Sequence, residues 1–281
     1  MYISANQFFI KEEDVKLSIK PWILQNQGSI LTEDIRANAA MPLLVDEHYK
    51  LLKQNAELLK FALPPYFTPD CIKSQANGIL TRNKLFQAAN VRLTIMRDIA
   101  SNQTEIIMTS QYAGTGPYED NTKGLFTDIY NEAYITTHRP NQLDQHCQLI
   151  NTMAKVSAIQ KGLDDMLLIT DQGFIVSATD SALFAIQKGK MLTPPLELGV
   201  RNDVMRKIVL DAATNIGYKI DSEAFIMPED LNEMDEIFLC NTAKGIQWIS
   251  GVKRHRYIHK ESKKIVGAVN NIIFSESQTQ S

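Results

Sequence analysis

The stretch Leu167–Met205, LLITDQGFIVSATDSALFAIQKGKMLTPPLELGVRNDVM, decides how the second half of this chain folds. It holds short apolar runs at 166–169, 174–176 and 182–186. Between these runs, Asp171-Gln172-Gly173 and Lys188-Gly189 supply residues that tolerate positive φ. The pattern therefore predicts consecutive antiparallel strands joined by tight turns.

A helix is expected directly after the break at Thr193-Pro194-Pro195. It should begin near Asp203 and end at Gly217, because the residues between them carry one apolar stripe at helical spacing: Val204, Ile208, Ala212 and Ile216. A helix whose N-terminus faces back toward the strands offers backbone N–H groups to an anion or a phosphate.

The order of these and other features resembles the fold-type IV pyridoxal-phosphate (PLP) enzymes, which include class IV aminotransferases for branched-chain and D-amino acids and aminodeoxychorismate lyase. The resemblance covers almost the whole chain and rests on Gly28, Glu33, 47–49, 162–168, 173–175, 183–184, 192–195, 204–206, 235–238 and 241–242. It implies an α+β fold with a two-subdomain, D-amino-acid aminotransferase-like architecture. The alternation of separate strand and helix groups also favours α+β.

We expect an N-terminal α/β subdomain at 1–124 and a strand-rich C-terminal subdomain at 125–275 that carries the PLP-type pocket. The boundary follows the loop-like stretch 111–124, which is rich in Gly, Asn and Asp. The polar tail 276–281 is expected to be disordered. Helices are predicted at 46–61, from Thr68-Pro69-Asp70 onward, at 142–161 with an apolar face, and at 262–273.

Composition excludes several classes of function. The 281 residues carry a net charge of -3, which gives no sign of a nucleic-acid partner. The three cysteines, Cys71, Cys147 and Cys240, have no metal-binding spacing and fit free thiols in a reducing compartment. No signal peptide and no apolar run of about 20 residues is visible, so we expect a cytoplasmic protein without a membrane partner or a metal.

PLP chemistry needs a lysine for the Schiff base, and the resemblance places this lysine ahead of the helix that precedes Gly162. Counting back reaches Asp144, and the window Gln142–Ile150 contains no lysine. Lys155 lies eleven residues further on, about 16 Å away along a helix. It could not replace the Schiff-base nitrogen without rebuilding the site.

The other anchors that the resemblance implies are also changed. Ser177 stands at the position of the acid that holds the pyridine nitrogen protonated, and Leu51 at that of the phosphate-binding arginine. Val204, Met205 and Thr242 match the amide and hydroxyl positions of a phosphate cup, which we interpret as vestigial. Asp203 replaces the family's preceding glycine, and its carboxylate would repel a phosphate.

We therefore predict a class IV aminotransferase-like or aminodeoxychorismate lyase-like protein that has lost its Schiff-base lysine: a non-catalytic pseudoenzyme or small-molecule binder. One alternative is an active PLP-dependent aminotransferase or lyase with an atypical site, using Lys244 or non-covalent PLP. Another is unrelated chemistry through Asp144 or His146. The resemblance further implies a homodimer, with an unidentified small molecule in the pocket between the subdomains.

Overall fold

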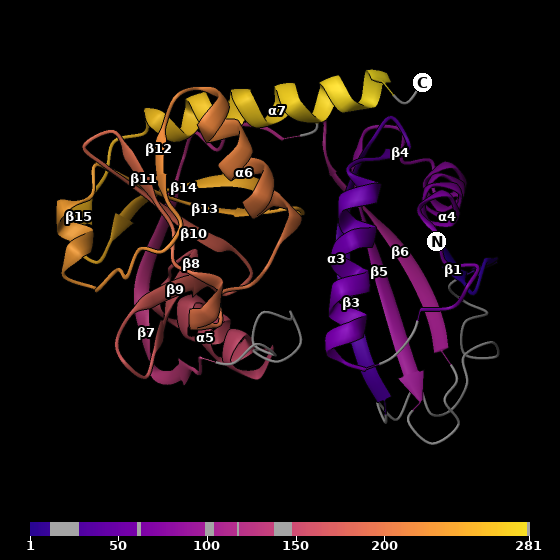
Figure 1. Cartoon of the computed structure of the whole chain (residues 1–281), viewed down its shortest axis with the longest axis horizontal. Helices are drawn as coiled ribbons and strands as arrows, with labels where there is room; N and C mark the ends of the chain where they lie inside the picture. Colours follow the sequence, from indigo (N-terminus) through magenta and orange to yellow (C-terminus); the bar gives the residue numbers. More distant parts are fainter. Residues whose placement is uncertain (12–27, 61–62, 99–103, 117, 138–147, 280–281) are drawn as a thin grey trace. The chain divides into compact units, whose positions relative to one another are not determined.

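The computed structural model describes residues 1–11, 28–60, 63–98, 104–116, 118–137 and 148–279, and it divides the chain into two compact units, Met1–Pro117 and Tyr118–Ser281 (Figure 1). The C-terminal unit thus begins at Tyr118 rather than at the expected residue 125. The Tyr118 hydroxyl donates a hydrogen bond to the carbonyl of Thr242 at 2.7 Å, and the Tyr118 carbonyl accepts one from Asn270 at 2.9 Å. These long-range bonds tie the residues before 125 to the C-terminal unit.

The N-terminal unit contains an antiparallel six-stranded sheet in the order β2-β1-β6-β5-β3-β4. Its strands are β1 (Tyr2–Ala5), β2 (Phe8–Lys11), β3 (Gly28–Asn38), β4 (Met41–Pro42), β5 (Ala88–Asp98) and β6 (Thr104–Gly114). The expectation of a loop from residue 111 is wrong for 111–114, because β6 continues its pairing with the first residues of β5 there.

Two helices, α3 (Val45–Leu58) and α4 (Pro69–Arg82), pack on this sheet. The predicted start of α4 is confirmed. Thr68 is its N-cap and accepts a hydrogen bond from the backbone N–H of Cys71 at 3.2 Å, with Pro69 at the first helical position.

In the C-terminal unit, one sheet runs in the order β12-β11-β10-β13-β14-β7-β8-β9, and a further pairing of β9 with β10 closes part of it into a ring. The strands are β7 (Leu125–Ile135), β8 (Asp165–Thr170), β9 (Ile175–Ala178), β10 (Ala182–Gln187), β11 (Lys190–Leu192), β12 (Lys219–Asp221), β13 (Glu236–Asn241) and β14 (Gly245–Val252), with β15 (His255–Arg256) beside β14. The predicted antiparallel succession from β8 to β11 is confirmed. Alternate residues of the ring strands, such as Leu167, Leu183, Leu239 and Ile249, form one apolar cluster.

The helices of this unit are α5 (Gln148–Lys161), α6 (Val204–Asn215) and α7 (Glu261–Thr279), with 3₁₀ turns η3 (Leu196–Leu198) and η4 (Asp230–Glu233). The first residues of the predicted helix 142–161 lie outside the described ranges. Of the helices that are described, none has the length and hydropathy to cross a lipid bilayer.

Two expectations about these helices need correction. The predicted apolar face of α5 is exposed, with Leu149 at 72% and Ile159 at 77%, because the small side chains of Ala154 and Ala158 pack inward instead. The tail 276–281 is not disordered throughout, since α7 continues to Thr279. No Gly or Pro interrupts its last turns, and extending a formed helix costs little.

Candidate functional site

The N-terminus of α6 is closed by the side chain of the residue that precedes it. Asp203 is the N-cap, with an extended backbone, and its Oδ1 accepts a hydrogen bond from the backbone N–H of Met205 at 2.7 Å. An aspartate at this position ends the extended segment and satisfies one of the free N–H groups of the first turn. Asp203 is only 3% exposed, so its negative charge lies inside the protein.

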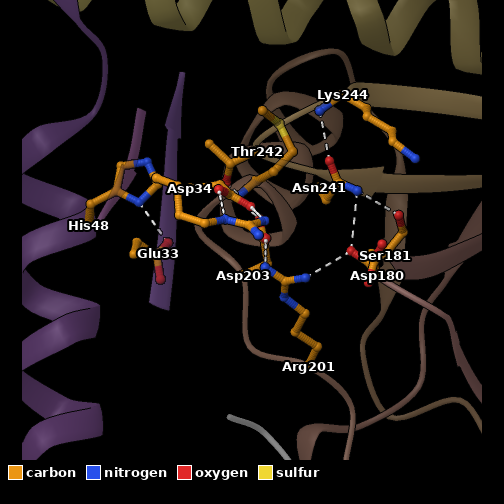
Figure 2. Close-up of polar contacts among 12 residues, drawn as sticks. Glu33, Asp34, His48, Asp180, Ser181, Arg201, Asp203, Asn241, Thr242 and Lys244 are labelled. Carbon is orange, nitrogen blue, oxygen red and sulfur yellow. Dashed lines mark hydrogen bonds and ion pairs between the residues drawn. The ribbon is translucent and has the colours of Figure 1, made fainter. Parts of the chain in front are cut away.

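The residue that follows β13 reaches the same carboxylate. Thr242 is 1% exposed, and its hydroxyl donates a hydrogen bond to Asp203 Oδ1 at 2.9 Å (Figure 2). Asp203 Oδ1 therefore accepts two hydrogen bonds, one from the N-terminus of α6 and one from the hydroxyl of Thr242. Val204, the first residue of α6, is also buried.

Arg201 connects this carboxylate to the turn between β9 and β10. Its Nη2 lies 3.5 Å from Asp203 Oδ2, and its Nη1 donates to the carbonyl of Asp180 at 3.0 Å. The same carbonyl accepts from Asn241 Nδ2 at 3.2 Å, and Asn241 also donates to Ser181 Oγ at 2.8 Å. The α6 N-terminus, the β13 end and the β9–β10 turn thus share one polar network (Figure 2).

The two lysines weighed as substitutes for a Schiff-base nitrogen are both described. Lys155 of α5 forms an ion pair with the carboxylate of Asp180. Lys244 is exposed, and Figure 2 shows its side chain extending away from Thr242 and Asp203. Asp144 and His146 lie outside the described residues.

The two substituted anchor positions are buried. Ser177 lies in β9, where every residue is buried, and its Cα pairs with Leu168 of β8 and Ala182 of β10. Leu51 belongs to the N-terminal unit and is one of the buried residues of α3. A leucine there packs with the apolar interior of its own unit and offers no charge.

A thiol and a guanidinium lie beside the network. Burial raises the pKa of the Cys240 thiol well above its ordinary value, and the charge of Asp203 raises it further. This thiol is therefore protonated at neutral pH and is a poor nucleophile. Arg206 is also buried, which lowers the pKa of its guanidinium, and its Nη2 donates to the carbonyl of Pro194 at 3.0 Å.

These residues do not fit the phosphate of PLP, the cofactor that the resemblance implies. The resemblance assigns the phosphate to the Met205 N–H and the Thr242 hydroxyl, and both of these groups donate to Asp203 instead. A phosphate brought to them would meet a buried carboxylate, and like charges at contact distance repel strongly in a medium of low dielectric. Among the residues that the structure describes, no cluster of His, Cys, Asp or Glu could hold a metal ion.

Of the residues expected at the phosphate cup, the structure brings Met205 and Thr242 together, since both donate a hydrogen bond to Asp203. Sequence analysis missed Asp180, Arg201 and Asn241 as parts of one network. Asn241 was visible only as the neighbour of Thr242. The contacts of Arg201 and Asp180 are made to backbone carbonyls or across separate segments, so neither residue type nor spacing indicates them.

The comparisons with known proteins agree on the family. The model of the family amino-transferase class IV matches residues 31–252. A protein of Methanocaldococcus jannaschii that carries the name of a branched-chain-amino-acid aminotransferase is 25% identical over 262 residues, which cover 88% of this chain and 86% of that protein. An aminodeoxychorismate lyase of Vibrio harveyi is 31% identical over 88 residues, covering 31% of this chain and 32% of the lyase.

A solved structure shows the same fold. The branched-chain amino acid aminotransferase of Thermobaculum terrenum, crystallised in its PLP form, superposes with a TM-score of 0.83 at 20% identity. The match covers 98% of this chain and 94% of that enzyme. The two-subdomain α+β architecture expected from the resemblance is therefore confirmed.

Proposed function

The chain belongs to the amino-transferase class IV family, and on that premise we propose that it is a non-catalytic member that binds a small molecule other than PLP. Transamination on this fold needs a lysine nitrogen that forms an imine with the cofactor and then moves a proton. The proposal therefore depends first on where the lysines lie.

The observation that carries the proposal is the placement of Lys155 and Lys244. Lys155 forms an ion pair with Asp180, which directs its ammonium group to that carboxylate. The side chain of Lys244 extends away from the network around Asp203 (Figure 2). The resemblance places Asp144 at the position of the family lysine, and a carboxylate cannot form an imine.

Ser177 supports the same conclusion, because its position matters for the pyridine nitrogen of the cofactor. When PLP is bound in this family, its ring acts as an electron sink only while the pyridine nitrogen stays protonated. A neutral hydroxyl at position 177 cannot stabilise that positive charge as a carboxylate does. A chain that had kept transamination chemistry would be expected to keep a carboxylate at this position.

The test is an absorption spectrum of the full chain after incubation with excess PLP and desalting, followed by borohydride reduction and peptide mass mapping. We expect no retained imine band and no adduct confined to one lysine. A stable band with an adduct on a single lysine would overturn the proposal in favour of an active aminotransferase or lyase with an atypical site. The matched variants Lys155→Met and Lys244→Met would then identify the nitrogen.

We also propose that the protein is a homodimer, as the family resemblance implies, and that it is cytoplasmic. Cys71 and Cys240 are free thiols, which suits a reducing compartment. Light scattering of the purified chain tests the assembly directly, and a monomer mass at micromolar concentration would contradict it.

A further inference from the structure

We infer that Asp203 is a built-in replacement for a bound phosphate, and that its carboxylate excludes phosphate-bearing ligands from the cup formed by Met205 and Thr242. The inference deepens the proposed function and rests on it, because it says which class of ligand this site rejects. It makes Asp203 a specificity-determining residue rather than only a helix cap.

The carboxylate takes the hydrogen bonds that an external anion would need. The Met205 N–H and the Thr242 hydroxyl reach Asp203 Oδ1 at 2.7 and 2.9 Å, and Arg201 Nη2 lies 3.5 Å from Oδ2. These groups come from the helix N-terminus, the end of β13 and the segment before α6. An ordinary N-cap needs only the first of these contacts, so the hydroxyl and the guanidinium go beyond capping.

Burial makes the replacement stable. Asp203 is 3% exposed, so its charge has lost most of its contact with water and depends on these donors. An incoming phosphate would have to displace a covalently attached carboxylate, which pays no translational entropy for staying in place. The Asp203 carboxylate therefore keeps these donors occupied when phosphate is present in solution.

The same geometry predicts what happens when the carboxylate is removed. Asp203→Gly restores the residue type that the family has at this position and leaves the Met205 N–H, the Thr242 hydroxyl and Arg201 without their common partner. Three donors around a vacated anion position favour an oxyanion from solution. The variant should therefore acquire a binding site that the wild-type chain lacks.

The experiment measures the binding of inorganic phosphate by titration calorimetry, and the phosphate dependence of the melting temperature, at constant ionic strength set with chloride. The wild type, Asp203→Gly, Asp203→Asn and Thr68→Gly are compared. Thr68→Gly is the matched control, because it removes the cap side chain of α4 and exposes an ordinary helix N-terminus. Asp203→Asn keeps an acceptor oxygen and the shape of the cap, so it is expected to fold even if the glycine variant does not.

We expect Asp203→Gly to bind phosphate at least about tenfold more tightly than the wild type, with Asp203→Asn between them and Thr68→Gly equal to the wild type. A glycine variant that folds only with phosphate present would support the inference equally. If neither Asp203 variant responds to phosphate more than the wild type and Thr68→Gly, Asp203 is only a cap and the inference is wrong. Its failure is distinct from that of the proposed function, which depends on the wild-type spectrum with PLP.

Discussion

The N-termini of α6 and α7 are both closed by a buried carboxylate, but the two carboxylates come from different places. At α6 the carboxylate belongs to Asp203, the adjacent residue. At α7 it belongs to Glu236 on β13, which accepts hydrogen bonds from the backbone N–H groups of Lys260, Glu261 and Ser262 at 3.1, 2.6 and 3.0 Å, and from the Ser262 hydroxyl. Glu236 and Asp203 are 1% and 3% exposed.

The difference distinguishes Glu236, which has a structural role, from Asp203, which we infer to replace a bound phosphate. Glu236 joins a strand to a helix more than twenty residues later in the chain, and all four of its contacts lie at that helix start. Asp203 needs only one contact to cap its helix, and its additional contacts reach elements where the family resemblance places a phosphate. Glu236, at the start of β13, therefore caps α7 for stability, whereas the carboxylate that Thr242 contacts after the end of β13 is the one to which we assign a role in ligand choice.

The largest effect is expected from Glu236→Gln. The variant replaces a charged acceptor by an amide whose NH₂ group faces backbone donors, so buried N–H groups lose their partner. We expect the free energy of unfolding to fall by about 3 kcal/mol, measured by urea denaturation. Glu233→Gln, on an exposed residue of η4, is the control and should change stability little. A loss below about 1 kcal/mol would mean that the α7 carboxylate is no stronger an anchor than an ordinary cap.

A smaller effect is expected from Thr242→Val, which keeps the shape of the side chain but removes the hydroxyl donor to Asp203. A buried charged acceptor that loses one donor should cost about 2 kcal/mol in urea denaturation. Thr68→Val at the exposed cap of α4 gives the value for simple capping, about 0.5 kcal/mol. Equal losses at both positions would argue that the Thr242 hydroxyl adds nothing to the Asp203 carboxylate.

The smallest effect concerns pH and Glu261, the first residue of α7. Hydrogen bonds from Lys264 and then from Tyr218 lower the pKa of Glu261 below its ordinary value of 4.5. A carboxylate with a lowered folded pKa adds stability above the unfolded pKa and loses it as the pH falls through the folded pKa. The gap in unfolding free energy between wild type and Glu261→Gln should therefore be present at about pH 7 and shrink at about pH 3. A gap that is constant with pH would show that the ionised form is not favoured by folding.

The sequence predicted most of the local structure and part of the site. Turn residues such as Gly173 and Gly189 marked the antiparallel strands, and Thr68-Pro69 marked the start of α4, because these signals act within a few residues. Helical spacing also placed an apolar face on α5, but spacing alone does not say which face meets the sheet. Leu149 and Ile159 are exposed, while the two alanines pack inward.

The remaining features depend on contacts between distant parts of the chain. Tyr118 joins the C-terminal unit through Thr242, and Glu236 caps a helix that starts in another segment. No local pattern around either residue indicates its partner. For the candidate site, the family resemblance pointed to Asp203, Met205 and Thr242. Only the structure shows that Oδ1 of Asp203 accepts hydrogen bonds from both Met205 and Thr242.

The ring of the C-terminal unit also sets the order in which the chain can fold during synthesis. β7 pairs on one edge with β8, the next strand along the chain, but its other edge pairs with β14, which begins at Gly245. Until the ribosome has released residues beyond Val252, β7 and β13 each keep an unpaired edge, and such edges attract other chains. Closure of a loop of this length is slow, so we expect the nascent unit to depend on protection from aggregation until its last strands emerge.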